Sequence, residues 1–516
     1  MIHWLRIGRA ALGIGVAFVL VSCGVPGDAG SDAGPRSEQS ASTAAQSASG
    51  ETAGAELAAK VSQQDLVAAL AQIETLTLDA SGSRGPGSAG YPATAGWIEN
   101  QLAATGFYDV YRQDFTIQIP HPGDSQLTDA GGRVINQAPL GFSPGTPDEG
   151  ITGVLVAATD GHGCRAADWP SEVAGQIGIA ERGGCSFADM NWAASQAGAA
   201  MMIVTNDRSG GLYGTLGGLR DGFIPATGVT SSEGNRLRTA MAAGEVQLSF
   251  TFAQNIESHP TYNLFAETRS GDAGNVVMAG AHLDSVPEGP GINDNGSGSA
   301  ILLTTALQMA SGQPPVNKVR YAWWSGEELG LLGSAHWVNT MVDSDPQTIQ
   351  QIAAYLNVDM VASPNGVIGV YDGDGSDFPD ETLPAGSGEV EQLFTGRFDS
   401  LAQPWVPIEM GGSSDHASFI NSGVPTGGLF TGAGDLKTHD EQAVFGGTAG
   451  QPYDPNYHQA ADGLANVNQD FLGINGKASA YAIGHLAWDT SIVNGSGSGN
   501  SGVPAKASSF GYAAAV

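Results

Sequence analysis

The chain has 516 residues, 41% of them hydrophobic, which is enough to fill more than one packed core. Its 20 Lys and Arg residues stand against 52 Asp and Glu residues, so the formal net charge is -32. A charge of this size repels phosphate backbones and anionic headgroups, which argues against a nucleic-acid-binding protein, and it is common among soluble exported proteins.

Residues 1–23 have the features of an export signal. Arg6 and Arg9 precede an apolar segment, residues 10–21, that is too short to cross a bilayer comfortably. The sequence LVSCG that ends this region resembles a bacterial lipobox, in which Cys23 would carry the lipid. Residues 24–55, rich in Ser, Ala and Gly, would form the tether. We therefore expect an exported protein that is lipid-anchored to the outer face of the cell membrane or released extracellularly; an ordinary cleaved signal with an incidental cysteine is the alternative.

Residues 56–125 form the first part of the main domain. Apolar residues at helical spacing predict helices over residues 61–75 and 95–105. Between them the sequence SRGPGS, residues 83–88, predicts a turn, and the alternating VYRQDFTI at residues 110–117 predicts a strand.

Residues 126–260 are predicted to form an inserted module, because short Val/Ile/Ala runs alternate there with glycine-rich turns. Within it the sequence QIGIAERGGCSFADMNWAASQAGAAMMIVTND, residues 176–207, resembles the protease-associated domain. That resemblance implies a β-rich domain without chemistry of its own that covers or gates the active site of its host enzyme. Cys164 and Cys185 lie close together in an exported protein, so we predict one disulfide; two unpaired thiols are the alternative.

Residues 261–490 alternate strands with helices, which predicts an α/β fold with a mainly parallel mixed sheet and helices on both faces. Three apolar runs, residues 275–282, 318–325 and 352–360, end in the polar sequences HLD, SGEE and NVDM. In open α/β sheets, sites assemble beyond the carboxyl ends of the strands, so acids far apart in the sequence can meet there. Residues 491–516 are expected to form a flexible tail.

The polar residues at these strand ends contain a set of potential metal ligands. Taken singly, HLD is typical of a strand-end histidine with its partner, DNG of a common turn, and EE of a solvated helix start. Together, His282, Asp294, Glu328 and Asp359 supply the imidazole and carboxylate groups that zinc binds, including a carboxylate to bridge two ions.

Five sequences in this order, AHLDSV, GINDNGSG, WSGEELGLLGS, NVDM and DPNYHQAAD, resemble the signatures of the bacterial secreted double-zinc aminopeptidases, which are leucine aminopeptidase-like enzymes. The resemblance extends from residue 61 to about residue 489, apart from the insert. It implies the zinc aminopeptidase fold and two Zn²⁺ per chain. Asp294 is implied to bridge the two ions, with His282 and Asp359 completing one site, and Glu328 and His458 completing the other.

The same resemblance implies roles for residues that do not bind metal. Glu327 would be the general base, and Tyr457 would hydrogen-bond the developing oxyanion. The Asp284 carboxylate would accept a hydrogen bond from His282 and fix its tautomer. The peptide bond between Asp294 and Asn295 is expected to be cis.

The chain also departs from the family pattern. Some members have a disulfide beside the ligand histidine where this chain has Asn456 and Ala461, so we expect Asp454-Pro455 and the metal to hold that loop. Some members have an Arg in the stretch that matches GGSSDHASF. This chain has no Arg there, so a substrate-binding role for that residue cannot be transferred to it.

The remaining histidines and serines carry weaker hypotheses. His416 is a candidate substrate contact, although a structural role is favoured, and His336 and His439 are expected to be solvated. Ser325 and Ser414 lack the Gly-x-Ser-x-Gly sequence of a serine hydrolase.

The sequence therefore predicts a lipid-anchored zinc aminopeptidase that removes amino-terminal residues from peptides with a free N-terminus, apolar residues being the family default. A carboxypeptidase or dipeptidase on the same metal frame is the nearest alternative, although Arg-poor surroundings weaken it. A non-catalytic peptide-binding surface lipoprotein is the alternative from another class.

Overall fold

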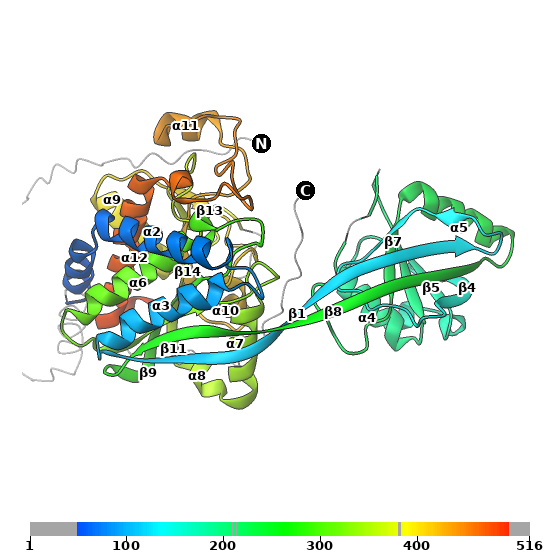
Figure 1. Ribbon diagram of the computed structural model, residues 1–516, viewed down its shortest axis with the longest axis horizontal. Coiled ribbons are helices and arrows are strands. Elements are labelled where there is room, and N and C mark those ends of the chain that lie inside the picture. The colour runs from blue at the N-terminus through cyan, green and yellow to red at the C-terminus, as the bar shows by residue number, and fades with distance from the viewer. Residues whose placement is uncertain (1–48, 209, 213, 380–382, 495–516) are drawn as a thin grey trace, which may run out of the picture. The chain divides into compact units, whose positions relative to one another are not determined.

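The computed structural model describes residues 49–208, 210–212, 214–379 and 383–494. The chain divides into two units, the first built from residues 49–113, 263–325 and 333–494, and the second mainly from Asp114–Tyr262. The predicted signal, Cys23 and residues 495–516 of the predicted tail lie outside the described residues, whereas residues 491–494 of that tail form a short helix. Two long strands pass through both units, β1 (Tyr108–Asp129) and β8 (Gln247–Thr268) (Figure 1).

The remaining strands of the first unit are β9 (Asp272–His282), β10 (Asn317–Trp324), β11 (Ile352–Val358), β12 (Gly369–Tyr371), β13 (Val406–Ile408) and β14 (Thr426–Phe430). Their order is β13-β12-β14-β11-β9-β10-β8. Pairing is parallel between β9 and β10, β9 and β11, β11 and β14, and β12 and β13, and antiparallel at β8 and between β12 and β14. The predicted mainly parallel mixed sheet is therefore confirmed.

The helices of the first unit are α2 (Gln63–Ala80), α3 (Gly90–Ala104), η3 (Ile292–Gly296), α6 (Ser297–Ala310), α7 (Leu332–Ser344), α8 (Pro346–Gln350), α9 (Ser387–Ser400), α10 (His416–Ile420), α11 (His439–Phe445), η4 (Leu464–Asn466), α12 (Gln469–Trp488) and α13 (Ser491–Asn494). The two helices expected at residues 61–75 and 95–105 correspond to α2 and α3.

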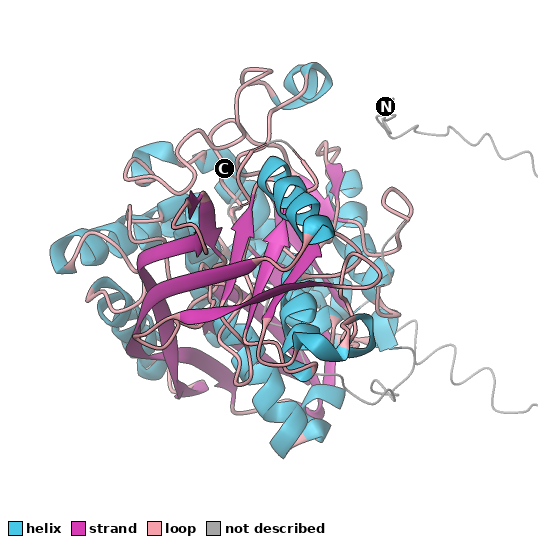
Figure 2. Cartoon of the chain, turned by 90° about the vertical axis from the view of Figure 1, so that its right-hand side faces the viewer, coloured by secondary structure: helices cyan, strands magenta, loops and turns pink. Residues whose placement is uncertain are grey.

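Helices cover both faces of this sheet. Successive side chains of a strand point to opposite sides, so neighbouring residues of β10 contact helices on opposite faces. Trp323 of β10 donates a hydrogen bond from its indole nitrogen to the Ser299 carbonyl of α6. Its neighbour Trp324 packs instead with Trp337 of α7 and Phe419 of α10. Figure 2 shows the helices of the chain in cyan and its strands in magenta.

The N-terminal boundary differs from the expected one. Residues 49–60 are helical, whereas the flexible tether was predicted to continue to residue 55. A β-carbon added at Gly54 would lie 2.6 Å from the Tyr481 carbonyl oxygen of α12, so this helix packs closely on α12. Tertiary packing, which the Ser/Ala/Gly-rich composition does not reveal, orders these residues.

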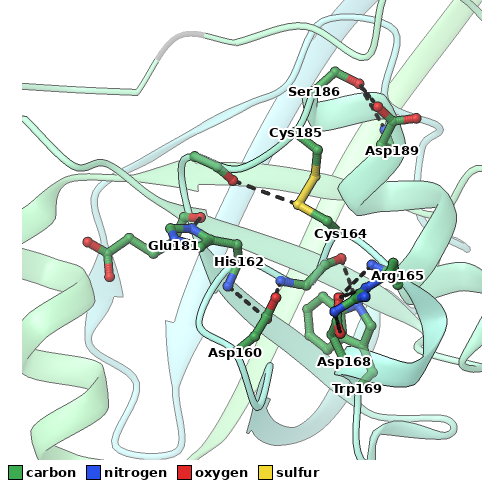
Figure 3. The surroundings of a disulfide bond; sticks show 12 residues. Asp160, His162, Cys164, Arg165, Asp168, Trp169, Glu181, Cys185, Ser186 and Asp189 are labelled. Atoms are coloured by element: carbon green, nitrogen blue, oxygen red, sulfur yellow. Dashed lines mark hydrogen bonds and ion pairs between the residues drawn. A yellow bond between two sulfur atoms is a disulfide. The ribbon is translucent and has the colours of Figure 1, made fainter.

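The second unit contains β2 (Val134–Ile135), β3 (Gln137–Pro139), β4 (Ile151–Ala157), η1 (Ala166–Asp168), η2 (Ser171–Val173), β5 (Ile177–Glu181), α4 (Phe187–Gln196), β6 (Met201–Thr205), β7 (Ala226–Val229) and α5 (Ser231–Ala243). Strands β4 to β7 pair in parallel, and β3 pairs antiparallel with β7. Cys164 and Cys185 form a disulfide, with their Cα atoms 5.9 Å apart (Figure 3). The insert therefore has parallel strand pairs and a covalent cross-link, and β4 connects its strands through β8 to the rest of the sheet.

Candidate metal centre

Three neighbouring parallel strands bring the predicted ligands together. His282 is the last residue of β9, Asp359 follows the end of β11, and Glu328 lies in residues 325–331, which connect β10 to α7. Because these strands are parallel, their carboxyl ends lie at the same edge of the sheet. Asp294 lies in η3, directly before α6.

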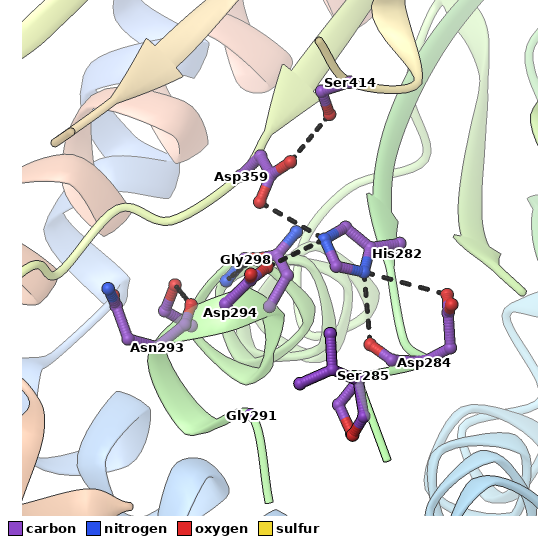
Figure 4. Close-up of polar contacts among 12 residues, drawn as sticks. His282, Asp284, Ser285, Gly291, Asn293, Asp294, Gly298, Asp359 and Ser414 are labelled. Carbon is purple, nitrogen blue, oxygen red and sulfur yellow. Dashed lines mark hydrogen bonds and ion pairs between the residues drawn. The ribbon is translucent and has the colours of Figure 1, made fainter. Parts of the chain in front are cut away.

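The Asp294 carboxylate lies between two histidines. Its Oδ1 atom is 3.2 Å from Nε2 of His282, and its Oδ2 atom is 3.2 Å from Nε2 of His458. The Oδ1 atom of Asp359 lies 3.3 Å from the same His282 nitrogen (Figure 4). Glu328 joins the second group, since ligand atoms of Asp294, Glu328 and His458 all lie within 4.8 Å of one another.

The residues fit zinc. Two ligand atoms bound tetrahedrally to one zinc ion at about 2.0–2.1 Å are separated by about 3.3 Å, close to the three nitrogen–oxygen distances found here. In addition, Oδ1 of Asp359 is buried without a hydrogen-bond partner, while its Oδ2 accepts a hydrogen bond of 2.7 Å from Ser414. A metal ion would complete the coordination of that orphaned oxygen.

The Asp294 carboxyl has a perturbed acidity. Burial by itself would raise its pKa, but hydrogen bonds from His282 and His458 and their positive charge outweigh burial and hold the pKa of Asp294 well below its usual range. The group is therefore an anion suited to binding cations.

The Nδ1 atom of His282 faces Asp284, as predicted, but its backbone carbonyl is nearer than its carboxylate. The Nδ1 atom of His282 lies 3.1 Å from the backbone carbonyl oxygen of Asp284 but 3.7 Å from its carboxylate. The carbonyl is thus the atom at hydrogen-bond distance, and it leaves Nε2 to face Asp294 and Asp359. The cis peptide bond expected between Asp294 and Asn295 is present.

The predicted catalytic residues lie next to these ligands in the chain. Glu327 precedes Glu328 and is half-buried. The Tyr457 ring stacks on the His458 imidazole, with 3.7 Å between the ring centroids. His416 is fully buried, with Nε2 2.5 Å from the Met410 carbonyl oxygen, which supports the structural role favoured for it.

The solvation expected of the other two histidines holds for only one of them. His439 is exposed at the start of α11. His336, on α7, is half-buried, and burial lowers its pKa. It is therefore only partly solvated.

Two residues beside the candidate ligands were not predicted from the sequence. Arg84, expected only as part of a turn, is fully buried, and its side chain donates to the carbonyl oxygens of Leu283, Pro290 and Gly291. Asp462 accepts hydrogen bonds from the backbone amides of residues 293 and 294. The sequence offered one signal for each of them. Arg84 is an arginine in a turn of an Arg-poor chain, and Asp462 is the Asp at the end of DPNYHQAAD.

The model of peptidase family M28 matches residues 263–483, and the PA domain model matches residues 151–237. The chain is 40% identical over 430 residues to leucine aminopeptidase 2 of Trichophyton rubrum, which covers 83% of this chain and 85% of that one. It is 39% identical over 444 residues to the probable lipoprotein aminopeptidase LpqL of Mycobacterium tuberculosis, covering 84% and 87%. The chain belongs to peptidase family M28.

Solved structures agree with the M28 fold. An aminopeptidase from Aneurinibacillus sp. strain AM-1 superimposes with a TM-score of 0.61 at 24% identity, covering 84% of this chain and 95% of that one. A zinc aminopeptidase from Bacillus subtilis gives a TM-score of 0.52 at 23% identity, covering 82% and 94%. The family expected from the five motifs, including its inserted protease-associated domain, is thus confirmed. This M28 protein is a metallo-aminopeptidase of the hydrolase class, and zinc is the metal that the family implies.

Proposed function

We propose that this M28 peptidase is an exported aminopeptidase that uses two zinc ions to hydrolyse the N-terminal peptide bond of peptides. The observation that carries the proposal is the Asp294 carboxylate, because each of its oxygens lies 3.2 Å from a different histidine nitrogen. One zinc would be held by His282, Asp294 and Asp359, and the other by Asp294, Glu328 and His458. Zinc bound there would polarise the scissile carbonyl and acidify water.

The residues of the chain then divide the proton transfers between them. Glu327 takes a proton from the attacking water and returns it to the leaving amine, because a carboxylate beside a ligand can face the water instead of the metal. Tyr457 donates a hydrogen bond to the carbonyl oxygen of the scissile bond, and its stacking on His458 holds its ring beside the ligands.

The restriction to a free N-terminus follows from charge. The site combines the carboxylates of Asp294, Glu328 and Asp359 with that of Glu327, and such a cluster attracts a protonated α-amine. We propose a preference for apolar N-terminal residues, in keeping with relatives that are named leucine aminopeptidases.

The proposed location is the outer face of the membrane. The lipobox-like sequence at Cys23 and the likeness to a probable lipoprotein aminopeptidase support a lipid anchor. Among the helices of the residues that the structure describes, none has the length and apolarity to cross a bilayer. Replacing Cys23 by Ser should move the enzyme from the membrane fraction to the soluble fraction, and unchanged membrane association would contradict the anchor.

The catalytic proposal is tested by comparing hydrolysis of leucine amide and N-acetyl-leucine amide, together with zinc content. We expect two zinc ions per chain and cleavage of the free amine only. Glu327→Ala should lower kcat roughly 10²- to 10⁴-fold without loss of zinc, whereas Glu389→Ala, which removes an exposed acid of α9, should match the wild type. Equal cleavage of both amides would refute the aminopeptidase assignment, and loss of zinc in Glu327→Ala would refute its separation from the ligands.

A further inference from the structure

The segment that carries His458 needs support from outside itself. Residues 454–462 belong to no strand, and His458 has φ of 58°, in the left-handed region. That conformation costs a residue with a β-carbon about 1–2 kcal/mol. Nevertheless, its Nε2 atom lies 3.2 Å from Oδ2 of Asp294.

Asp462, four residues after His458, provides a direct link to the segment that carries Asp294. Its carbonyl oxygen accepts a hydrogen bond of 3.0 Å from the amide of Ile292, its Oδ1 one of 2.9 Å from Asn293, and its Oδ2 one of 3.0 Å from Asp294. Three successive backbone amides thus donate to one residue, which is 2% exposed.

Asp454 at the other end of the segment makes a second link. Its Oδ2 atom accepts a hydrogen bond of 2.7 Å from the Asn293 side chain, and the Asn466 side chain donates to the carboxylates of both Asp454 and Asp462. Asn456 donates from its side chain to Asn466 at 2.8 Å. Buried hydrogen bonds therefore connect the segment at both ends.

Close packing reinforces these bonds. A β-carbon added at Gly289 would lie 2.3 Å from the Gln459 carbonyl oxygen and 3.0 Å from the Cα atom of Ala460. Only glycine leaves room for this approach, which is independent of the carboxylates.

The other half of the site is held differently. His282 is part of a central strand, and the Asn295 side chain donates to the Val358 carbonyl at 2.9 Å, which ties the Asp294 turn to the strand before Asp359. Ser414 orients Asp359 at 2.7 Å. These contacts do not involve Asp462.

We propose that Asp462 is a positioning residue that fixes His458 against the bridging Asp294 and so determines binding of the zinc ion shared by Asp294, Glu328 and His458. The inference rests on the two-zinc function proposed above. Loss of the Asp462 carboxylate should weaken this ion selectively, because the zinc on His282 and Asp359 keeps its supports.

The test is the zinc retained by Asp462→Asn after dialysis against a graded series of chelator concentrations. Asparagine keeps the size of the side chain, but its NH₂ group cannot accept from the amide of Asn293 or Asp294. We expect one zinc to be released at a chelator concentration roughly 10- to 100-fold lower than in the wild type, with the second zinc released as in the wild type. Gly289→Ala should show the same selective release through the Gln459 contact.

Asp168→Asn is the matched control. Asp168 is 6% exposed and accepts hydrogen bonds from the backbone amide and the guanidinium of Arg165, but it does not join the candidate ligand segments. We expect it to lower the unfolding temperature without selective zinc release.

Each outcome decides between the proposals. Simultaneous release of both ions from Asp462→Asn, or release identical to that of the wild type, would overturn the positioning role. A wild-type protein that never holds two zinc ions would instead overturn the proposed function itself.

Discussion

The two halves of the candidate metal site are supported in different ways. His282 and Asp359 lie at the ends of β9 and β11, and their side chains are 1% and 10% exposed. His458 lies in an irregular segment, and its side chain is 20% exposed. Asp294 belongs to both halves.

The difference shows two ways of fixing a ligand. A strand in the middle of a sheet has its backbone hydrogen bonds made by its neighbours, so a side chain at its end is placed by the whole core. An irregular segment has no such ladder, and its position depends on a few side-chain hydrogen bonds, each worth more when buried. The half that contains His282 and Asp359, called the strand-end half below, should therefore tolerate substitution of neighbouring residues better than the half that contains His458.

The largest effect is expected where the halves meet. Asp294→Ala removes a carboxylate that contacts both His282 and His458, so both zinc ions should be lost and kcat/KM should fall roughly 10³-fold or more. Metal analysis and leucine amide hydrolysis measure this. Asp470→Ala, which removes an exposed acid of α12, is the control. A variant that retains one tightly bound zinc would show that the halves are independent.

Removal of Arg84 tests the strand-end half. Arg84→Met leaves three buried carbonyl oxygens without their donor, which should lower the free energy of unfolding by roughly 3–5 kcal/mol, as measured by urea titration. Arg269→Met, at a side chain 59% exposed, should cost little. If Arg84→Met is as stable as the wild type, the loop after His282 is held by the sheet alone.

The disulfide extends the comparison to the second unit. Cys164→Ser with Cys185→Ser opens a loop with a sequence separation of 21 residues, which should destabilise that unit by about 3 kcal/mol and leave zinc content unchanged. Thermal unfolding and metal analysis measure both quantities, and wild-type protein treated with reductant is the control. Zinc loss in the double variant would contradict the expectation that the disulfide does not support the candidate metal site.

The smallest effect is expected at Glu391, outside both halves. Burial raises the pKa of its carboxyl from 4.5 to about 7. The folded protein then holds a proton that the unfolded chain releases, so this residue lowers the free energy of unfolding as pH rises from about 4.5 to 7. Glu391→Gln should lose that dependence. Its free energy of unfolding, measured by urea titration at a series of pH values, should change less steeply with pH between about 4.5 and 7. An identical slope in the two proteins would contradict the assignment.

Much of the strand-end half could be predicted from the sequence. His282, Asp294 and Asp359 each follow a buried apolar run or open a glycine-rich helix start, and such patterns are local. Arg84 could not be assigned in this way, because its partners at residues 283–291 are about 200 positions away. The same holds for the helix at residues 49–60, which is ordered by packing on α12.

By itself, the sequence determined the α/β class, the inserted domain and the family, and it named candidate metal ligands, because these follow from residue periodicity and from short ordered motifs. Only the tertiary structure decided which atoms make the supporting hydrogen bonds. These atoms are the Asp284 carbonyl, which is nearer to His282 than its carboxylate is, the Arg84 side chain at three carbonyls, and Asp462 between two candidate ligand segments. Hydrogen bonds between distant segments depend on ångström-scale geometry, and that geometry exists only once the sheet has brought those segments together.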